Sequence, residues 1–428
     1  MTVFTDEQKV QLLADLIAIQ SVNDHEELVA QYLKRVLTDH DIDARIVPVS
    51  SGRANLIAEI GHGSPILGIS GHMDVVSPGD VTQWQSDPFK LSERSGNLYG
   101  RGASDMKSGL AALVIAMIEL QAAGQPKTGR IRLMATIAEE VGETGSQAFL
   151  EQGAMDDVDA LLIGEPSGYR VFYAHKGSMD IRLTAQGKAA HSSMPEMGVN
   201  AIDPLLVILN QANQVFRNSD RHNELLGDLA FNTTVFQGGN QVNSIPEMAT
   251  AEMNVRTIPE FNNDQVVATL KELVDQQNQQ GAQVSTDVYM SQWPVEEPKE
   301  TLLSQLAVKI GADYAGTAIP KLALPAVTDA SNLLKQKGHE FPFIIFGPGS
   351  DTAHQVDEYV NKQMFLDFTQ LYQQLFIDTC NKQHAPRWLK RTLTVFQIVG
   401  NCRRPFIRLI LDNPVGKLPS RHDHCPKA

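Results

Sequence analysis

Histidine and carboxylate side chains follow short apolar runs at several points along this chain of 428 residues. The first such segment is Ser70-Gly71-His72-Met73-Asp74. Because side chains alternate along a strand, His72 and Asp74 are predicted to point to the same side. An imidazole so placed can bind a metal ion while the carboxylate orients it from behind. Taken alone, the pair is more simply explained by a surface histidine beside a turn.

Four further carboxylates occupy comparable positions. Asp105 lies in a glycine-rich approach to a predicted helix, where it could also serve only as an N-cap. Glu139 and Glu140 follow a predicted buried strand, where adjacent carboxylates need a nearby positive charge or solvent. An exposed charged loop is the plain alternative. Glu165 follows another apolar run and precedes Pro166, which a simple turn would also explain.

His354 supplies a second imidazole, after an apolar run and the turn Gly347-Pro348-Gly349. Ligands in open α/β sheets lie beyond the carboxyl ends of the strands, so all these segments can face one crevice. Together they offer two imidazoles and three carboxylates as metal ligands, with two further carboxylates. Nitrogen and oxygen ligands without thiolates suit zinc, cobalt or manganese. Two cations at one site need a shared carboxylate, which five ligands with one bridging would provide.

Alternating helical and extended patterns predict the scaffold. Helical periodicity covers residues 7–19, 26–38, 107–123, 144–152 and 363–377, and apolar runs at 44–49, 54–60, 65–70, 130–138, 159–163 and 342–346 predict strands. This alternation is typical of an α/β fold, with a sheet covered by helices. Residues 178–292 instead predict about four strands and two helices, which form a smaller α+β domain. We therefore expect a discontinuous domain of residues 1–177 and 293–380, with 178–292 inserted.

The composition narrows the class of protein. Hydrophobic residues at 42% and charged residues at 20% describe a soluble globular protein with a sizeable core. No apolar run approaches the roughly 18–20 residues of a membrane span, and the first residues do not resemble a secretory signal. The three cysteines, Cys380, Cys402 and Cys425, lie near the C-terminus and leave no disulfide framework. This pattern favours a cytoplasmic protein.

Charge is distributed unevenly along the chain. The net charge is −14, but after Cys380 ten Lys or Arg residues and two Asp residues give +8, so residues 1–380 carry −22. The acidic body argues against nucleic acid or an anionic membrane as a partner. We expect the basic tail, residues 381–428, to be disordered or non-native. The alternative is an appendage that touches a membrane or nucleic acid.

The motifs together resemble the signature of a zinc-dependent family. It contains aminoacylase, acetylornithine deacetylase, succinyl-diaminopimelate desuccinylase and glutamate carboxypeptidase. The resemblance covers about residues 5–378, and it is closest to the branch of the deacetylase and the desuccinylase. It is carried by His72-x-Asp74, Gly100-Arg101-Gly102-x-x-Asp105-Met106-Lys107, Glu139-Glu140, Gly164-Glu165-Pro166 and His354.

The resemblance implies two zinc ions per subunit, which cobalt can replace. His72 and Glu165 would hold one zinc, Glu140 and His354 the other, and Asp105 would bridge them. It also implies a zinc-exopeptidase-like fold and a cis peptide bond after the bridging aspartate.

The resemblance also implies the reaction. Asp74 would orient His72, and Glu139 would be the general base for a water held between the metals. Glu139 would then pass the proton to the leaving amine. The expected reaction is the removal of an acyl group from the nitrogen of a small amino acid.

The inserted domain resembles the family's lid and dimerisation domain. Residues 187–193 read Gly-Lys-Ala-Ala-His-Ser-Ser, and His191 would stabilise the developing oxyanion in the partner subunit's site. Asn243 and Arg256 would contact the substrate carboxylate. A loop histidine beside serines and a salt-bridged strand arginine are the plain alternatives. Lid residues acting in the partner's site imply a homodimer through residues 178–292.

Two departures bear on the substrate. Desuccinylases often carry two arginines where this chain has His175-Lys176, and Ser-Asp-Gly-Arg where residues 328–332 read Thr-Asp-Ala-Ser-Asn. A missing arginine removes a bidentate carboxylate anchor. Lys176 and Gly349 are the substrate-binding candidates that remain in the catalytic domain. A succinyl-diaminopimelate desuccinylase of lysine biosynthesis is favoured. An acetylornithine deacetylase, an exopeptidase acting on dipeptides and a non-catalytic metal-binding protein stay open.

Overall fold

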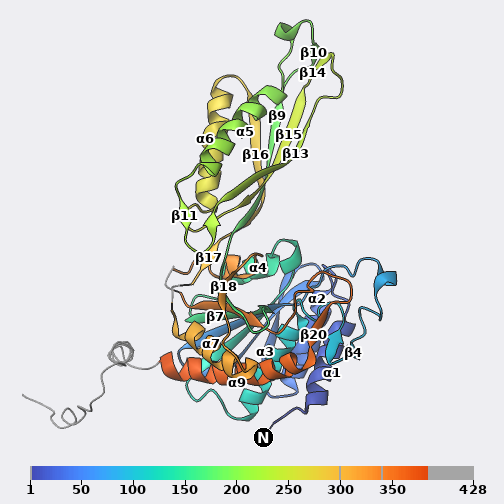
Figure 1. Cartoon of the computed structure of the whole chain (residues 1–428), viewed down its shortest axis with the longest axis vertical. Coiled ribbons are helices and arrows are strands. Elements are labelled where there is room, and N and C mark those ends of the chain that lie inside the picture. Colours follow the sequence, from blue (N-terminus) through green and yellow to red (C-terminus); the bar gives the residue numbers. More distant parts are fainter. Residues whose placement is uncertain (1, 298–299, 339–340, 384–428) are drawn as a thin grey trace, which may run out of the picture. The chain divides into compact units, whose positions relative to one another are not determined.

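A nine-stranded mixed sheet forms the centre of the larger domain in this computed structural model, which describes residues 2–297, 300–338 and 341–383 (Figure 1). Across the sheet the strands are β1 (Ala44–Ser50), β2 (Arg53–His62), β6 (Gly129–Thr136), β3 (Ile66–His72), β7 (Ala160–Pro166), β19 (Phe343–Gly347), β8 (Val171–His175) and β17 (Val295–Glu296), with β18 (Lys321–Leu324) paired to β8. The neighbours β6, β3, β7 and β19 run parallel to one another. Their carboxyl ends therefore share one edge of the sheet.

Helices cover both faces of this sheet. They are α1 (Asp6–Ala18), α2 (Glu26–Thr38), α3 (Lys107–Ala122), α4 (Thr144–Glu151), α7 (Leu302–Ala315), α8 (Ala330–Leu333) and α9 (Lys362–Gln383). Along β7, Leu162 joins the core under α1, α3 and α9, whereas Leu161 and Ile163 join the core under α4 and α8. This alternation, with apolar side chains on both faces, is what a strand between two layers of helices requires.

Helix α3 lies at the centre of the core that it forms with α1 and α9. Every residue from Lys107 to Leu120 is buried, so the helix is enclosed by other elements on all sides. It contacts α9, α1 and β3. The short elements nearby are η1 (Val81–Gln83), η2 (Glu139–Val141) and a three-stranded sheet of β4 (Ser92–Arg94), β5 (Asn97–Tyr99) and β20 (Tyr359–Asn361).

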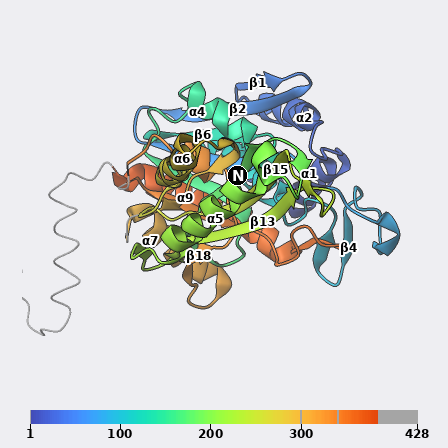
Figure 2. The ribbon, with the colours of Figure 1, turned by 90° about the horizontal axis from the view of Figure 1, so that it is seen from above.

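The smaller domain is an antiparallel sheet with two helices and a core of its own. Its strands are β13 (Ala230–Gly238), β15 (Met248–Arg256), β9 (Ser178–Gln186) and β16 (Gln283–Gln292), in that order across the sheet, and its helices are α5 (Ile202–Arg217) and α6 (Asn263–Gln279). Alternate residues of β9, including Ile181 and Leu183, pack into a core to which α5 and α6 contribute. Figure 2 shows α5 lying along β13.

Three short pieces complete the smaller domain. Two are strand pairs, β10 (Ala190–His191) with β14 (Ser244–Ile245) and β11 (His222–Asn223) with β12 (Gly227–Asp228), and the third is η3 (Pro195–Met197). The predicted fold class, a helix-covered sheet with an inserted smaller α+β domain, is confirmed. None of the helices within the described ranges is both long and apolar enough to cross a membrane. From residue 384 onward, the basic tail lies outside the described residues.

Candidate metal centre

The shared edge of the parallel strands brings the first ligand candidates together. His72 is the last residue of β3, Glu165 lies near the end of β7, and Glu139 and Glu140 lie in η2, just after β6. His72 is paired with Thr136, the last residue of β6. The register therefore places the imidazole beside the start of the segment that carries the two glutamates.

Asp105 lies between the two imidazoles. His72 Nε2 is 3.0 Å from Asp105 Oδ1, and His354 Nε2 is 3.4 Å from Asp105 Oδ2. His354 Nε2 is also 3.0 Å from the carboxylate of Glu140, and His72 Nε2 is 3.7 Å from Glu165 Oε1. The five side chains that the sequence singled out thus form one connected cluster. Each oxygen of Asp105 faces a different imidazole, as a bridging carboxylate would require.

The donor set fits divalent cations. Two overlapping groups, His72 with Asp105 and Glu140, and His72 with Glu139 and Glu165, offer ligand atoms within 4.8 Å of one another. Glu165 Oε1 is buried and has no hydrogen-bond partner. Burying a carboxylate oxygen in this way costs free energy, and a bound cation would offset that cost. Imidazole nitrogens and carboxylate oxygens without a thiolate suit zinc and related ions.

Asp74 supports both His72 and the glutamate segment. The backbone oxygen of Asp74 is 2.9 Å from His72 Nδ1, whereas its carboxylate Oδ1 is 3.5 Å away. The carboxylate accepts the backbone N–H groups of Glu139 and Glu140, each at 3.2 Å. Strand β3 ends at His72, so the strand alternation used in the sequence argument does not extend to Asp74. Asp74 still orients the imidazole of His72 at Nδ1, chiefly through its backbone carbonyl.

The electrostatics of the cluster show an excess of negative charge. Burial raises the pKa of Glu139 well above its usual value, and the charge of Glu165 adds to this. Burial also raises the pKa of Glu165. Hydrogen bonds to Asp105 and Glu140 raise the pKa of His354 to about 10. In all three cases the negative charge of neighbouring carboxylates contributes to the shift. Divalent cations would supply the missing charge.

Sequence reasoning missed Glu143, which lies beside this cluster. Its buried carboxylate accepts hydrogen bonds from Gln292 Nε2 and, at 3.2 Å, from Asn332 Nδ2. Burial and the nearby Asp329 raise the pKa of Glu143 well above its usual value. The available signal was a third glutamate closely following Glu139 and Glu140, after a turn at Gly142. Glu143 connects the glutamate segment to Gln292, at the end of β16.

The candidate residues of the smaller domain form a separate group at its tip. His191 of β10 is paired with Ser244 of β14, and its Nδ1 is 2.8 Å from Ser193 Oγ. The backbone N–H of Ser192 donates to the oxygen of Asn243 at 3.0 Å. The structure thus brings His191 and Asn243 together, but the ligand cluster does not include them.

Lys176 and Arg256 lie on the two segments that cross between the domains. Gly177 and Thr257, the residues that follow them, exchange two backbone hydrogen bonds of 3.0 and 3.1 Å. Lys176 Nζ donates to the backbone oxygen of Asp228 at 2.6 Å. A side chain at Gly349 would come within 2.4 Å of Pro166, so the backbone at Gly349 passes close to the segment that carries Glu165.

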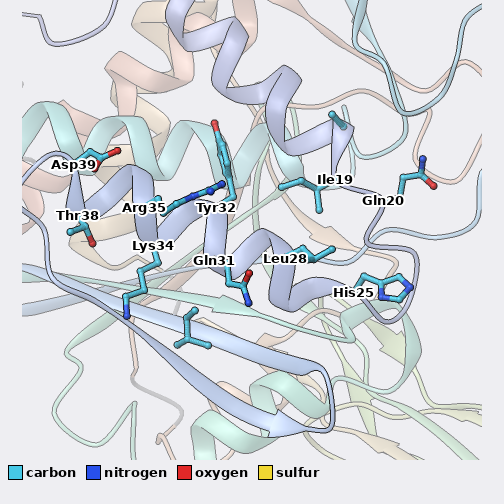
Figure 3. A pocket seen from close by; sticks show the side chains of 12 residues that line it. Ile19, Gln20, His25, Leu28, Gln31, Tyr32, Lys34, Arg35, Thr38 and Asp39 are labelled. Carbon is cyan, nitrogen blue, oxygen red and sulfur yellow. The ribbon is translucent and has the colours of Figure 1, made fainter.

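A groove along α2 offers no comparable chemistry. It has a volume of about 1080 Å³, and its lining residues include Leu28, Gln31 and Tyr32 (Figure 3). Its lining holds one imidazole, His25, and one carboxylate, Asp39. These two flank opposite ends of α2 and are therefore roughly 20 Å apart at about 1.5 Å per helical residue. The five-residue cluster is thus the candidate active site.

The fold and the cluster define a metal-dependent hydrolase that acts on amide bonds, and comparison with known proteins gives the family. Residues 68–378 match the family described as "Peptidase family M20/M25/M40". The chain belongs to this family. Its Asp105–Met106 peptide bond is cis, as the resemblance implied.

Individual relatives are similar over most of their length. A "Probable succinyl-diaminopimelate desuccinylase" of Staphylococcus epidermidis is 42% identical, and the match covers 88% of this chain and 98% of the relative. A "Succinyl-diaminopimelate desuccinylase" of Wolbachia pipientis is 30% identical over 85% of this chain and 92% of that protein. A solved structure from Bacillus subtilis, described as "a Dinuclear Metal Binding Peptidase from M20 Family", shares the fold. It superposes with a TM-score of 0.65 at 18% identity and covers 88% of this chain and 98% of its own.

Proposed function

We propose that the chain is a succinyl-diaminopimelate desuccinylase, which hydrolyses the amide between a succinyl group and an amino acid nitrogen. The observation that carries the proposal is the position of Asp105 between His72 and His354, with Glu139 beside them. The names of relatives that match nearly the whole chain support the choice of substrate. The product would enter lysine biosynthesis.

Two zinc ions are the proposed cofactor, with cobalt as a substitute. His72 and Glu165 would hold one ion, Glu140 and His354 the other, and Asp105 would contribute an oxygen to each. Such a pair of cations polarises an amide carbonyl and lowers the pKa of a water held between them.

Glu139 is the proposed general base. Its carboxylate belongs to the same ligand group as His72 and Glu165, and the N–H of its backbone is held by Asp74. Glu139 would accept the proton of the attacking water and pass it to the amine that leaves.

Substrate carboxylates would be held by residues of both domains. Arg256 and Lys176 lie on the two segments of the crossover, where an arginine fork or a lysine ammonium can bind a carboxylate. Gly349, whose backbone passes close to Pro166, would contact the substrate beside the segment that carries Glu165. Asn243 would contribute from the tip, next to His191.

A homodimer through residues 178–292 would complete the site. Strand β13 is an edge strand with exposed Val235 and Phe236, and α5 exposes Leu206 and Val207. Exposed apolar side chains beside an unpaired edge are typical of an interface.

The nine residues of β9 separate the crossover from the tip by roughly 30 Å at about 3.3 Å per residue. This separation favours a role for His191 as oxyanion donor in the partner's site. We place the enzyme in the cytoplasm because its cysteines offer no disulfide framework. The acidic charge of residues 1–380 argues against a nucleic acid or an anionic membrane as a partner.

A substrate panel tests the proposal. The metal-loaded protein is assayed with N-succinyl-L,L-diaminopimelate, N-acetylornithine and simple dipeptides, each with added zinc or cobalt. We expect kcat/KM for the succinyl substrate to exceed the others by at least about 100-fold, because a site built for a carboxylate discriminates against an acyl group that lacks one. A chelator should abolish the activity, and zinc or cobalt should restore it. Faster turnover of N-acetylornithine or of a dipeptide would reassign the substrate. An absence of turnover by the metal-loaded chain would favour a binding protein.

A further inference from the structure

Glu358 is a fully buried carboxylate that faces the backbone of the Asp105 segment. Its Oε1 accepts the N–H groups of Ser104 at 2.7 Å and of Asp105 at 2.8 Å. Its Oε2 accepts the N–H of Gly102 at 3.2 Å. Three backbone donors on one carboxylate fix the path of this short segment, including the peptide group of Asp105 itself.

Arg101 supplies the positive charge that this buried carboxylate needs. Its side chain is 1% exposed, and its Nη1 donates to Glu358 Oε2. Its Nη2 donates to the backbone oxygen of Ser77 at 3.3 Å, and the guanidinium lies 5.3 Å from the ring centre of Trp84. Because both charges are removed from water, each one depends on the other. The pair is therefore a rigid unit rather than a surface ion pair.

The same stretch of chain carries Glu358 and His354. His354 faces Asp105 Oδ2 from the far side, while Glu358, four residues later, holds the backbone N–H of Asp105. Tyr359 is paired with Tyr99 in the small sheet, and the oxygen of Glu358 accepts the N–H of Gly100. One stretch thus sets both the side chain that Asp105 faces and the backbone from which Asp105 projects.

We infer that the buried Arg101–Glu358 pair is the positioning unit that sets Asp105 between the two imidazoles and so determines metal affinity at both sites. The inference rests on the proposed metal site. The approach to Asp105 contains Gly100 and Gly102, and Gly102 has a φ of +86°. A glycine-rich segment is costly to order, so its conformation must be imposed from outside. The carboxylate of Glu358 supplies that constraint.

The test is metal binding by Glu358→Gln. The amide would keep an oxygen for Ser104 and Asp105, but its NH₂ group would face the donors of Arg101 and Gly102. We expect zinc affinity, measured by chelator competition on metal-free protein, to fall by about 10- to 100-fold, as is typical when the group that orients a ligand is lost. The absorption spectrum of the cobalt-loaded variant should change as well. Glu358→Asp keeps the charge but is too short to reach all its partners, and it should lose affinity in the same way.

Glu297→Gln is the matched control. Glu297 is also buried and charge-paired, at 2.8 Å from Lys321, but it bonds to Thr301 at the start of α7. This variant should lose thermal stability while its zinc affinity stays unchanged. If the Glu358 variants lose stability but bind zinc as the unaltered chain does, Glu358 is only structural and the inference is wrong. If the unaltered chain itself binds no divalent metal, the proposed function fails instead.

Hydrogen exchange gives a test that does not depend on how the variants fold. In metal-free unaltered protein, the amides of Gly102, Ser104 and Asp105 should exchange as slowly as those of the core strands. Fast exchange that becomes slow only when zinc is added would mean that the metal, and not Glu358, orders the segment. That result would overturn the inference.

Discussion

Replacement of Glu139 by glutamine is expected to lower kcat by about 10²- to 10⁴-fold, the usual contribution of a general base. Metal content should stay at the level of the unaltered chain, because the five proposed ligands remain. The amide cannot take a proton from water, although it has nearly the shape of the carboxylate. Steady-state kinetics with the succinyl substrate and metal analysis of the purified variant measure the two quantities separately.

Glu140→Gln is the control for this prediction, since the two glutamates are adjacent and both backbone N–H groups bond to Asp74. Glu140 lies 3.0 Å from His354, so its variant should lose metal as well as activity. Near-normal turnover by Glu139→Gln would refute the assignment of the base. Loss of metal by Glu139→Gln would make that residue a ligand instead.

Two inactive variants are expected to restore activity when they are co-expressed. Glu139→Gln removes the base from the larger domain, and His191→Ala removes the proposed oxyanion donor from the tip of the smaller domain. If His191 acts in the partner's site, each mixed dimer holds one intact site out of two. When the two variants pair at random, half of the dimers are mixed, so about a quarter of all sites are intact. Activity should therefore return to about a quarter of that of the unaltered chain.

Co-expression of Glu139→Gln with Glu140→Gln is the matched control. Both of these changes lie in the larger domain, so no site in a mixed dimer is intact and no activity should return. Sedimentation at assay concentration gives the oligomeric state independently. A fully active monomer, or an absence of recovery from the Glu139 and His191 pair, would contradict the proposed dimer.

The spacing of apolar residues predicted the helices and strands of the larger domain closely, because burying one face of an element imposes that spacing. The helix predicted over residues 107–123 is α3, Lys107–Ala122, and the run at 130–138 corresponds to β6, Gly129–Thr136. The small sheet of β4, β5 and β20 was not predicted, because three-residue strands are too short to show a period. It nevertheless matters, since it joins the segment before Asp105 to the segment after His354.

Motif spacing indicated which carboxylates could gather, but not what holds them. Strand ends predicted His72 and Glu165 at one edge, and the structure brings them to 3.7 Å. Glu358 gave no such signal, because its partners are backbone N–H groups that lie more than 250 residues earlier. Contacts of this kind depend on the tertiary path of the chain, which local sequence patterns do not contain.

The central claim is that five side chains hold two divalent cations on either side of Asp105. Anomalous diffraction at the zinc edge, from crystals of zinc-loaded chain, tests it most directly. We expect two peaks per chain, one against His72 and Glu165 and the other against Glu140 and His354, with Asp105 contacting both. A single peak, or strong peaks away from these residues, would contradict the account.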